Sequence, residues 1–121
     1  MTVFNLGSIN ADHFYSVPRL PGPGETIAAG ALGTGLGGKG ANQSVAAARA
    51  GARVVHIGAV GADGAWAVGR LRGHGVDTRH VAVVDRPTAH AIINVDPAGE
   101  NAIVIFPGAN HAQDPARIAA A

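Results

Sequence analysis

Short apolar runs separated by glycine and proline occupy the first part of the chain. Residues 2–9 are apolar, are rich in strand-forming types and end near a Gly-Ser pair, which predicts a first β-strand leading into a functional loop. Residues 13–17 predict a second short strand, which Pro18 closes. Residues 18–24 are mostly proline and glycine and predict a turn, and residues 26–32 predict a weaker strand before a cluster of glycines.

The central part of the chain alternates between helical and strand patterns. Residues 42–50 are rich in alanine and free of glycine and proline, and Gly51 follows them as a helix stop. Residues 53–60 form a nearly continuous apolar run, typical of a strand that is covered on both faces. Residues 63–74, which open on an aspartate suited to capping, predict a second helix. Residues 39–75 therefore predict the helix–strand–helix alternation of a doubly wound α/β sheet.

The last third of the chain is richer in strands. Three strand-like runs cover residues 80–85, 90–96 and 101–106, and the Asp-Pro-Ala-Gly turn between the last two predicts a hairpin. An Asp-Pro pair at 114–115 then opens a helix that the chain leaves unfinished at residue 121. We expect a truncated chain on that ground.

The composition indicates one domain built from small residues. A chain of 121 residues suffices for one domain and is too short for two ordinary ones, and 18 of its residues are glycine. The absence of cysteine excludes disulfides, thiolate zinc sites and cysteine nucleophiles, and it fits a reducing compartment.

Charge and hydropathy argue against two classes of partner. The chain has nine Lys and Arg and eight Asp and Glu, and neither half of it has a marked excess of basic residues. We therefore expect no nucleic-acid partner. The longest Ala/Val-rich stretch, 45–62, is interrupted by Arg49, Arg53 and His56, so we expect no membrane partner. The N-terminus lacks a basic region, and we therefore expect no signal peptide and a cytoplasmic protein.

The glycine cluster at 33–40 matches two phosphate-binding patterns imperfectly. The dinucleotide fingerprint lacks its supporting acid, because no Asp or Glu occurs between Glu25 and Asp63. The P-loop pattern fails at its last position, where Gly40 replaces the hydroxyl residue that binds magnesium. Consecutive glycines before a helix still expose backbone N–H groups to a ligand, although a flexible loop explains them equally well. Lys39, the single lysine, lies inside this cluster.

Polar side chains follow the first predicted strand. Asn10 and Asp12 lie at its carboxyl end, where open α/β sheets bind ligands, although ordinary turn chemistry also uses these residue types. The six histidines form no metal-binding spacing, and we expect His56 to be a satisfied core histidine and Trp66 to serve in packing.

Five segments of the chain, taken in order, carry a family resemblance. They are Gly-Ser-Ile-Asn-Ala-Asp at 7–12, Pro-Gly-Glu-Thr at 23–26, Gly-Gly-Lys-Gly-Ala-Asn-Gln at 37–43, Gly-Glu-Asn at 99–101 and Gly-Ala-Asn at 108–110. With them the chain resembles the N-terminal part of the ribokinase-like (PfkB-type) carbohydrate kinases. Two features depart from the family: Trp66 stands where a glycine is common, and the Gly-Ala-Gly-Asp signature that carries the catalytic aspartate is missing.

The resemblance implies a three-layer α/β core with a mostly parallel, Rossmann-like sheet and a small β-sheet lid, here incomplete. Residues 1–121 would be the N-terminal part of the kinase domain, with a core strand at 2–9, a core helix–strand–helix at 39–75, and lid strands at about 13–32 and within 80–106. The lid would also form a homodimer contact. The implied sugar-binding residues are Asn10, Asp12, the backbone N–H groups of Gly37 and Gly38, Lys39 and Asn42.

The activity implied by the resemblance is transfer of the γ-phosphoryl group of ATP, with Mg²⁺, to a sugar hydroxyl, ribose being the first choice of sugar. Most of the ATP and Mg²⁺ site would lie outside this chain, which would hold no catalytic residue and no metal ligand and would be inactive alone. Two alternatives stay open. One is a non-catalytic sugar-binding or dimerising module, and the other is a related kinase acting on a nucleoside or a phosphosugar.

Overall fold

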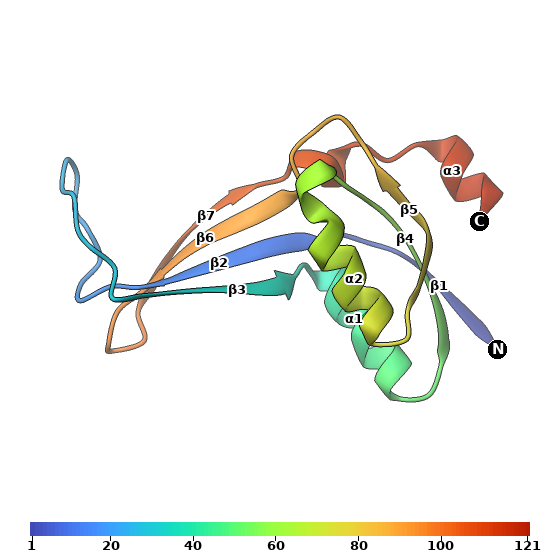
Figure 1. Cartoon of the computed structure of the whole chain (residues 1–121), viewed down its shortest axis with the longest axis horizontal. Coiled ribbons are helices and arrows are strands. Elements are labelled where there is room, and N and C mark those ends of the chain that lie inside the picture. Colours follow the sequence, from blue (N-terminus) through green and yellow to red (C-terminus); the bar gives the residue numbers. More distant parts are fainter.

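The computed structural model describes residues 1–121 as two β-sheets with helices packed on one of them (Figure 1). The first sheet is parallel, with the strand order β1 (Thr2–Leu6), β4 (Arg53–Val60), β5 (Asp77–Val83). The second is mixed, with the order β3 (Ala31–Gly37), β2 (Asn10–Ser16), β6 (Ala89–Val95), β7 (Asn101–Phe106). In it β2 and β6 are parallel and the other pairs antiparallel. This arrangement confirms the expected α/β class with a mostly parallel core sheet and a separate smaller sheet.

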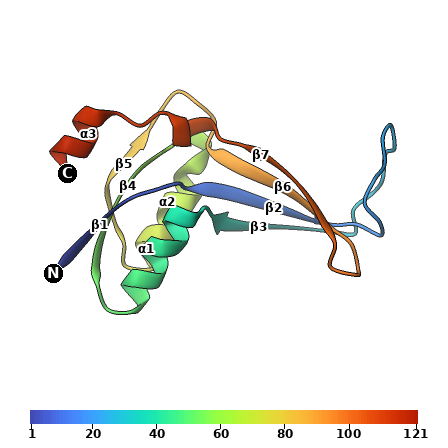
Figure 2. The ribbon, with the colours of Figure 1, turned by 180° about the vertical axis from the view of Figure 1, so that it is seen from behind.

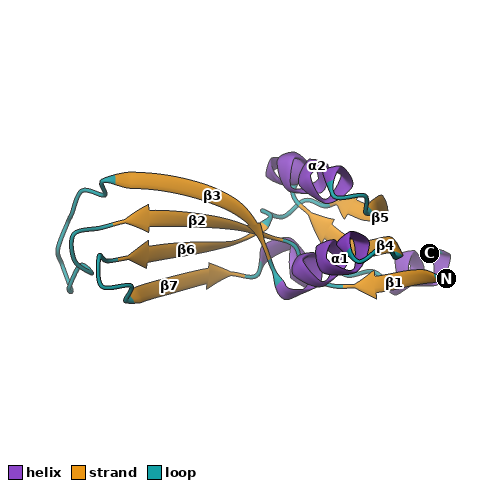
Figure 3. Cartoon of the chain, turned by 90° about the horizontal axis from the view of Figure 1, so that it is seen from below, coloured by secondary structure: helices purple, strands orange, loops and turns teal.

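Two helices cover the parallel sheet, and the second sheet extends away from them (Figure 3). These are α1 (Lys39–Arg49) and α2 (Ala65–Gly73), and a third helix, α3 (Pro115–Ala120), follows near the C-terminus. Single 3₁₀ turns at 62–64 and 108–111 complete the helical elements. Figure 2 shows both termini at the end of the molecule remote from the loop that joins β2 to β3. None of the helices has the length and apolarity needed to cross a membrane.

The apolar core lies between the parallel sheet and the two helices. Every residue of β4 after Arg53 is buried, as its continuous apolar run predicts for a central strand. Leu71 of α2 and Ala41 of α1 are fully buried against this sheet. Small residues such as Ala41 let the helices lie close to the strands.

Several predicted boundaries are wrong in instructive ways. The first strand ends at Leu6 and not at Ile9, because the backbone of Ser8 is used to cap α1. The strand predicted at 26–32 is displaced to β3, so part of the glycine cluster is a strand and not a loop. There Gly33, Gly35 and Gly37 pair with β2, whose ladder supplies the hydrogen bonds that define a strand.

Asp63 does not cap the second helix, contrary to the prediction. The N-cap of α2 is Gly64, which supplies no side-chain bond. The Asp63 carboxylate instead accepts hydrogen bonds from the backbone N–H of Thr88 (3.0 Å) and from its hydroxyl (2.7 Å). These bonds lower the pKa of Asp63. The carboxylate thus ties the start of α2 to the start of β6, where the two sheets meet.

Candidate functional site

The two sheets join where β1 leads into β2 and where β3 leads into α1. The first turn of α1 lies directly on the loop after β1: the Ser8 carbonyl accepts from Ala41 N–H at 2.9 Å and its hydroxyl from Gly40 N–H at 3.2 Å. A Cβ at Gly40 would collide with the backbone of Gly7 and Ser8. A helix start with no cap of its own is therefore capped by a distant loop.

A buried polar network holds this junction in place. His56 on β4 is fully buried, accepts from the Ser44 hydroxyl at Nδ1 (2.7 Å) and donates from Nε2 to the Gly7 carbonyl (2.9 Å). Asn5 donates both to Ser44 Oγ and to the Gly40 carbonyl, each at 2.9 Å. Burial lowers the pKa of His56, so its neutral form fits these roles. His56 is the satisfied core histidine that the sequence predicts.

Asp12 lies on β2 with its carboxylate against the last residue of β3. A Cβ at Gly37 would collide with both carboxylate oxygens, so a larger residue at that position would force the Asp12 side chain to turn away. Burial raises the pKa of Asp12, and the nearby His13 opposes this only in part. No donor within the protein stabilises the carboxylate, which therefore offers its oxygens to a ligand.

Asn10, at the start of β2, is held by a residue from the far end of the chain. Asn110 donates from Nδ2 to Asn10 Oδ1 at 2.9 Å and accepts from Ile9 N–H at 3.0 Å. Sequence reasoning did not include Asn110 in the site. The Gly-Ala-Asn segment at 108–110 was the available signal, because it was part of the family resemblance.

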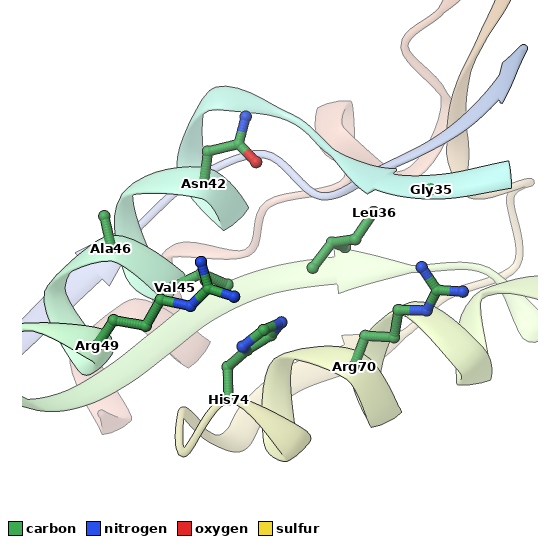
Figure 4. A pocket seen from close by; sticks show the side chains of 8 residues that line it. All are labelled: Gly35, Leu36, Asn42, Val45, Ala46, Arg49, Arg70 and His74. Atoms are coloured by element: carbon green, nitrogen blue, oxygen red, sulfur yellow. The ribbon is translucent and has the colours of Figure 1, made fainter.

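The remaining predicted residues lie along the β3–α1 connection. Gly37 is buried, and Gly38 adopts a φ of 91°, a left-handed conformation that favours glycine. Lys39 and Asn42 are exposed on the first turns of α1. The Asn42 amide lies at the edge of a separate cavity between α1 and α2 and points away from Arg49 and His74 (Figure 4).

The structure thus brings four predicted residues to one place and leaves two beside it. Asn10, Asp12, Gly37 and Gly38 meet at the paired ends of β2 and β3. No hydrogen bond or ion pair links Asp12 to the side chain of Lys39 or Asn42.

The chemistry of this junction suits a neutral polyhydroxylated ligand. A carboxylate without a protein donor accepts strongly from hydroxyl groups. No group of three or more histidine, aspartate or glutamate side chains is arranged to hold a metal ion.

Comparison with known proteins points in the same direction. Residues 2–121 match the family described as pfkB family carbohydrate kinase. The chain is 46% identical over 112 residues to the ribokinase of Haemophilus influenzae, an alignment that covers 90% of this chain and 37% of that relative. The chain therefore spans well under half the length of the relative it matches.

Solved structures agree with the sequence comparison. The ribokinase of Cryptococcus neoformans var. grubii serotype A in complex with ADP superposes with a TM-score of 0.82 at 43% identity, covering 89% of this chain and 35% of that one. The ribokinase of Arabidopsis thaliana complexed with ribose and ATP gives a TM-score of 0.81 at 38% identity, covering 90% and 36%.

Proposed function

Because the chain belongs to the pfkB family of carbohydrate kinases, we propose that it supplies the sugar-binding part of an enzyme that transfers the γ-phosphoryl group of ATP to a hydroxyl of ribose. Similarity to ribokinases supports ribose as the sugar. The Arabidopsis relative is described with ribose and ATP, the two substrates that this proposal requires.

The single observation that carries the proposal is the position of the Asp12 carboxylate. It lies against Gly37, beside the start of α1, and no protein donor occupies its oxygens. In the proposed complex this carboxylate accepts hydrogen bonds from two sugar hydroxyls. An ionised acceptor in a partly buried site makes stronger bonds than a neutral one.

The other predicted residues complete the proposed sugar site. The backbone N–H groups of Gly37 and Gly38 and the amide of Asn42 would donate to the sugar oxygens, and Asn10 would add a further contact. Lys39, which is exposed, would contribute least. Such a ring of directed donors and acceptors fixes a sugar hydroxyl in the orientation that phosphoryl transfer requires.

ATP and Mg²⁺ complete the proposed reaction. ATP would supply the phosphoryl group, and a bound Mg²⁺ would supply positive charge to the phosphate oxygens. The residues proposed above bind the sugar, and none of them is assigned to ATP or Mg²⁺. Its proposed contribution is to bind and orient the sugar. We further propose that the second sheet acts as a lid over the sugar and as the contact of a homodimer.

Titration calorimetry of the chain with ribose and with ATP tests the proposal. We expect ribose to bind and the Asp12→Ala variant to lose most of that affinity. Asp85→Ala is the matched control, because Asp85 is exposed and lies away from the junction. Failure of ribose to bind the folded chain, or equal binding by Asp12→Ala and the control, would count against the sugar site. A second measurement adds the C-terminal part of a family member and looks for phosphoryl transfer. If ribose binds but no phosphoryl transfer occurs, the chain is better described as a sugar-binding module.

A further inference from the structure

A cavity of about 470 Å³ lies between α1, α2 and the end of β3, separate from the junction around Asp12 (Figure 4). Its walls are partly apolar and include Leu36, Val45 and Ala46. Its remaining lining is mainly basic and includes Arg49, Arg70 and His74. No carboxylate lines it. A cavity of this volume is within the range that holds small molecules.

The basic side chains of this cavity have no acidic partners in the protein. The two ion pairs of the chain join Arg19 to Glu25 and Arg79 to Asp77, so neither Arg49 nor Arg70 takes part in one. The Arg70 guanidinium lies 5.3 Å from the ring centre of Trp66, a contact that restrains it. The side chains of Arg49 and His74 extend into one side of the cavity, and Arg70 lies at the other side (Figure 4). Two guanidinium groups that line one cavity without a counter-charge repel one another, and a bound anion relieves that repulsion.

We propose that this cavity binds a compact organic polyanion, a phosphate ester or a polycarboxylate, through Arg49 and Arg70. The planar guanidinium fork matches the paired oxygens of phosphate and carboxylate groups. The apolar wall formed by Leu36 and Val45 suits a ligand with a carbon body better than a bare inorganic ion. Asn42 lines the edge of the same cavity, so the bound anion lies next to a residue of the proposed sugar site.

The same side chains could instead serve only to stabilise the C-terminal ends of the two helices. Arg49 is the last residue of α1, Arg70 is in the last turn of α2 and His74 is its C-cap, where positive groups stabilise a helix. That role predicts an effect on helix stability and no saturable binding. Binding itself is therefore the quantity to measure.

Nuclear magnetic resonance of the ¹⁵N-labelled chain, without sugar present, provides the test. Citrate serves as the polycarboxylate and glycerol 3-phosphate as the phosphate ester, with glycerol and ionic-strength-matched KCl as blanks. We expect saturable shifts of the amide signals around Arg49, Arg70 and His74 with at least one of the two anions. The anion that binds more tightly identifies the ligand class. Shifts that neither anion saturates, or that KCl reproduces, overturn the proposal.

Charge-neutral variants locate the site. Arg49→Gln with Arg70→Gln should weaken binding by about tenfold or more, as expected for losing two charge-assisted hydrogen bonds. Arg53→Gln is the matched control, because Arg53 is exposed and lies outside the cavity, and it should leave the affinity unchanged. Equal weakening in the control and the double variant would show non-specific attraction and reject the site. Because no sugar is present in this experiment, the anion-binding result can be interpreted even if the chain does not bind ribose.

Discussion

Asn110 donates from its side-chain Nδ2 to Oδ1 of Asn10 at 2.9 Å, across a separation of 100 residues in sequence. Its own Oδ1 accepts from the backbone N–H of Ile9 at 3.0 Å. The Asn110 amide is thus fixed at both ends. Since Oδ1 of Asn10 is the acceptor of this pair, its Nδ2 group remains as a donor for a ligand at the junction of the two sheets.

Two substitutions at Asn110 should both weaken ribose binding, although they disturb its two contacts in different ways. Asn110→Asp keeps an acceptor for Ile9 N–H but sets a carboxylate oxygen against Asn10 Oδ1, so we expect the Asn10 amide to turn over. Asn110→Ala removes both contacts. Ribose affinity should fall in each by roughly tenfold, the effect of about one lost hydrogen bond to a buried polar group.

The two Asn110 variants can be separated by magnetic resonance without any sugar. Amide exchange at Ile9 should stay slow in Asn110→Asp and become faster in Asn110→Ala, while the Asn10 side-chain signals should move in both. Unmoved Asn10 signals in both variants would show that Asn110 does not orient Asn10.

The Asp12 carboxylate should lower the stability of the folded chain at neutral pH, although we propose that it binds ribose. Burial raises the pKa of this carboxyl, so the folded chain holds its proton to higher pH than the unfolded chain does. The sign follows from linkage: stability falls as pH rises from the ordinary aspartate value of about 4 through the raised value, and the cost is fully present at neutral pH. Asp12→Asn removes the charge and should raise the melting temperature at pH 7 while lowering ribose affinity.

Thermal melts of the wild type and Asp12→Asn at several pH values check this prediction. The advantage of the variant should shrink as the pH falls toward about 4 and should vanish below about pH 3, where the wild-type carboxyl is protonated in both the folded and the unfolded chain. A variant that is less stable at pH 7 would indicate that the carboxylate supports the fold within β2 and would remove the argument for a ligand.

The sequence predicted most accurately the features that depend on residues close together in the chain. The central strand coincides with the apolar run at 53–60, and the hairpin of β6 and β7 forms where its turn signal predicts it. Asp12 and Gly37 belong to short continuous motifs, and the pairing of β2 with β3 makes them diagonal neighbours, so that the Asp12 carboxylate lies against Gly37. Local pattern was sufficient there because each element is specified by its own residues.

Sequence reasoning failed where a distant partner decides the outcome. Gly33 and Gly35 have poor strand propensity, and only pairing with β2 makes them a strand. Asp63 has the ideal position for a helix cap, yet Thr88 offers it two donors from another element. Asn110 acquires its role only through the fold, since Asn10 lies 100 residues away.

Two helix glycines should respond in opposite ways to alanine. In Gly40→Ala the added methyl collides with the backbone of Gly7 and Ser8, and we expect a loss of about 2–4 kcal/mol of unfolding free energy, as for other overpacked sites. In Gly69→Ala the methyl meets no atom, so helix propensity should stabilise the chain by about 0.5–1 kcal/mol. Urea unfolding measures both, and equal effects would contradict the close approach of α1 to the Gly7 loop.

Stability should also depend on the protonation of His56. Burial lowers the pKa of this histidine, so the unfolded chain takes up its proton at higher pH than the folded chain does. Stability is therefore lost as pH falls below about 6.5, the ordinary histidine value. His56→Gln does not titrate, and the other histidines are common to both chains. The difference in unfolding free energy between wild type and variant should narrow from pH 7.5 to pH 5, and a constant difference would refute a buried neutral His56.

Self-association should occur through one face of the second sheet. Strand pairing places Asp12, Phe14, Ile103 and Ile105 on the same face, and the three apolar side chains there are 42%, 53% and 67% exposed. The opposite face also exposes Leu32, Val104 and Phe106, but it carries polar groups such as His13 and is partly covered near Trp66. An apolar face with no helix over it favours pairing with a second copy.

Two lysine substitutions on neighbouring residues of β7 distinguish the two faces of this sheet. Ile105→Lys places a charge on the Asp12 face, and Val104→Lys places one on the opposite face, because alternate residues of a strand point to opposite sides. Sedimentation velocity should show a dimer for the wild type and Val104→Lys and a monomer for Ile105→Lys. Phe4→Lys tests the free edge of β1, where Phe4 is 57% exposed. If only Phe4→Lys dissociates the dimer, the chains associate through the core sheet, and the proposed lid contact is wrong.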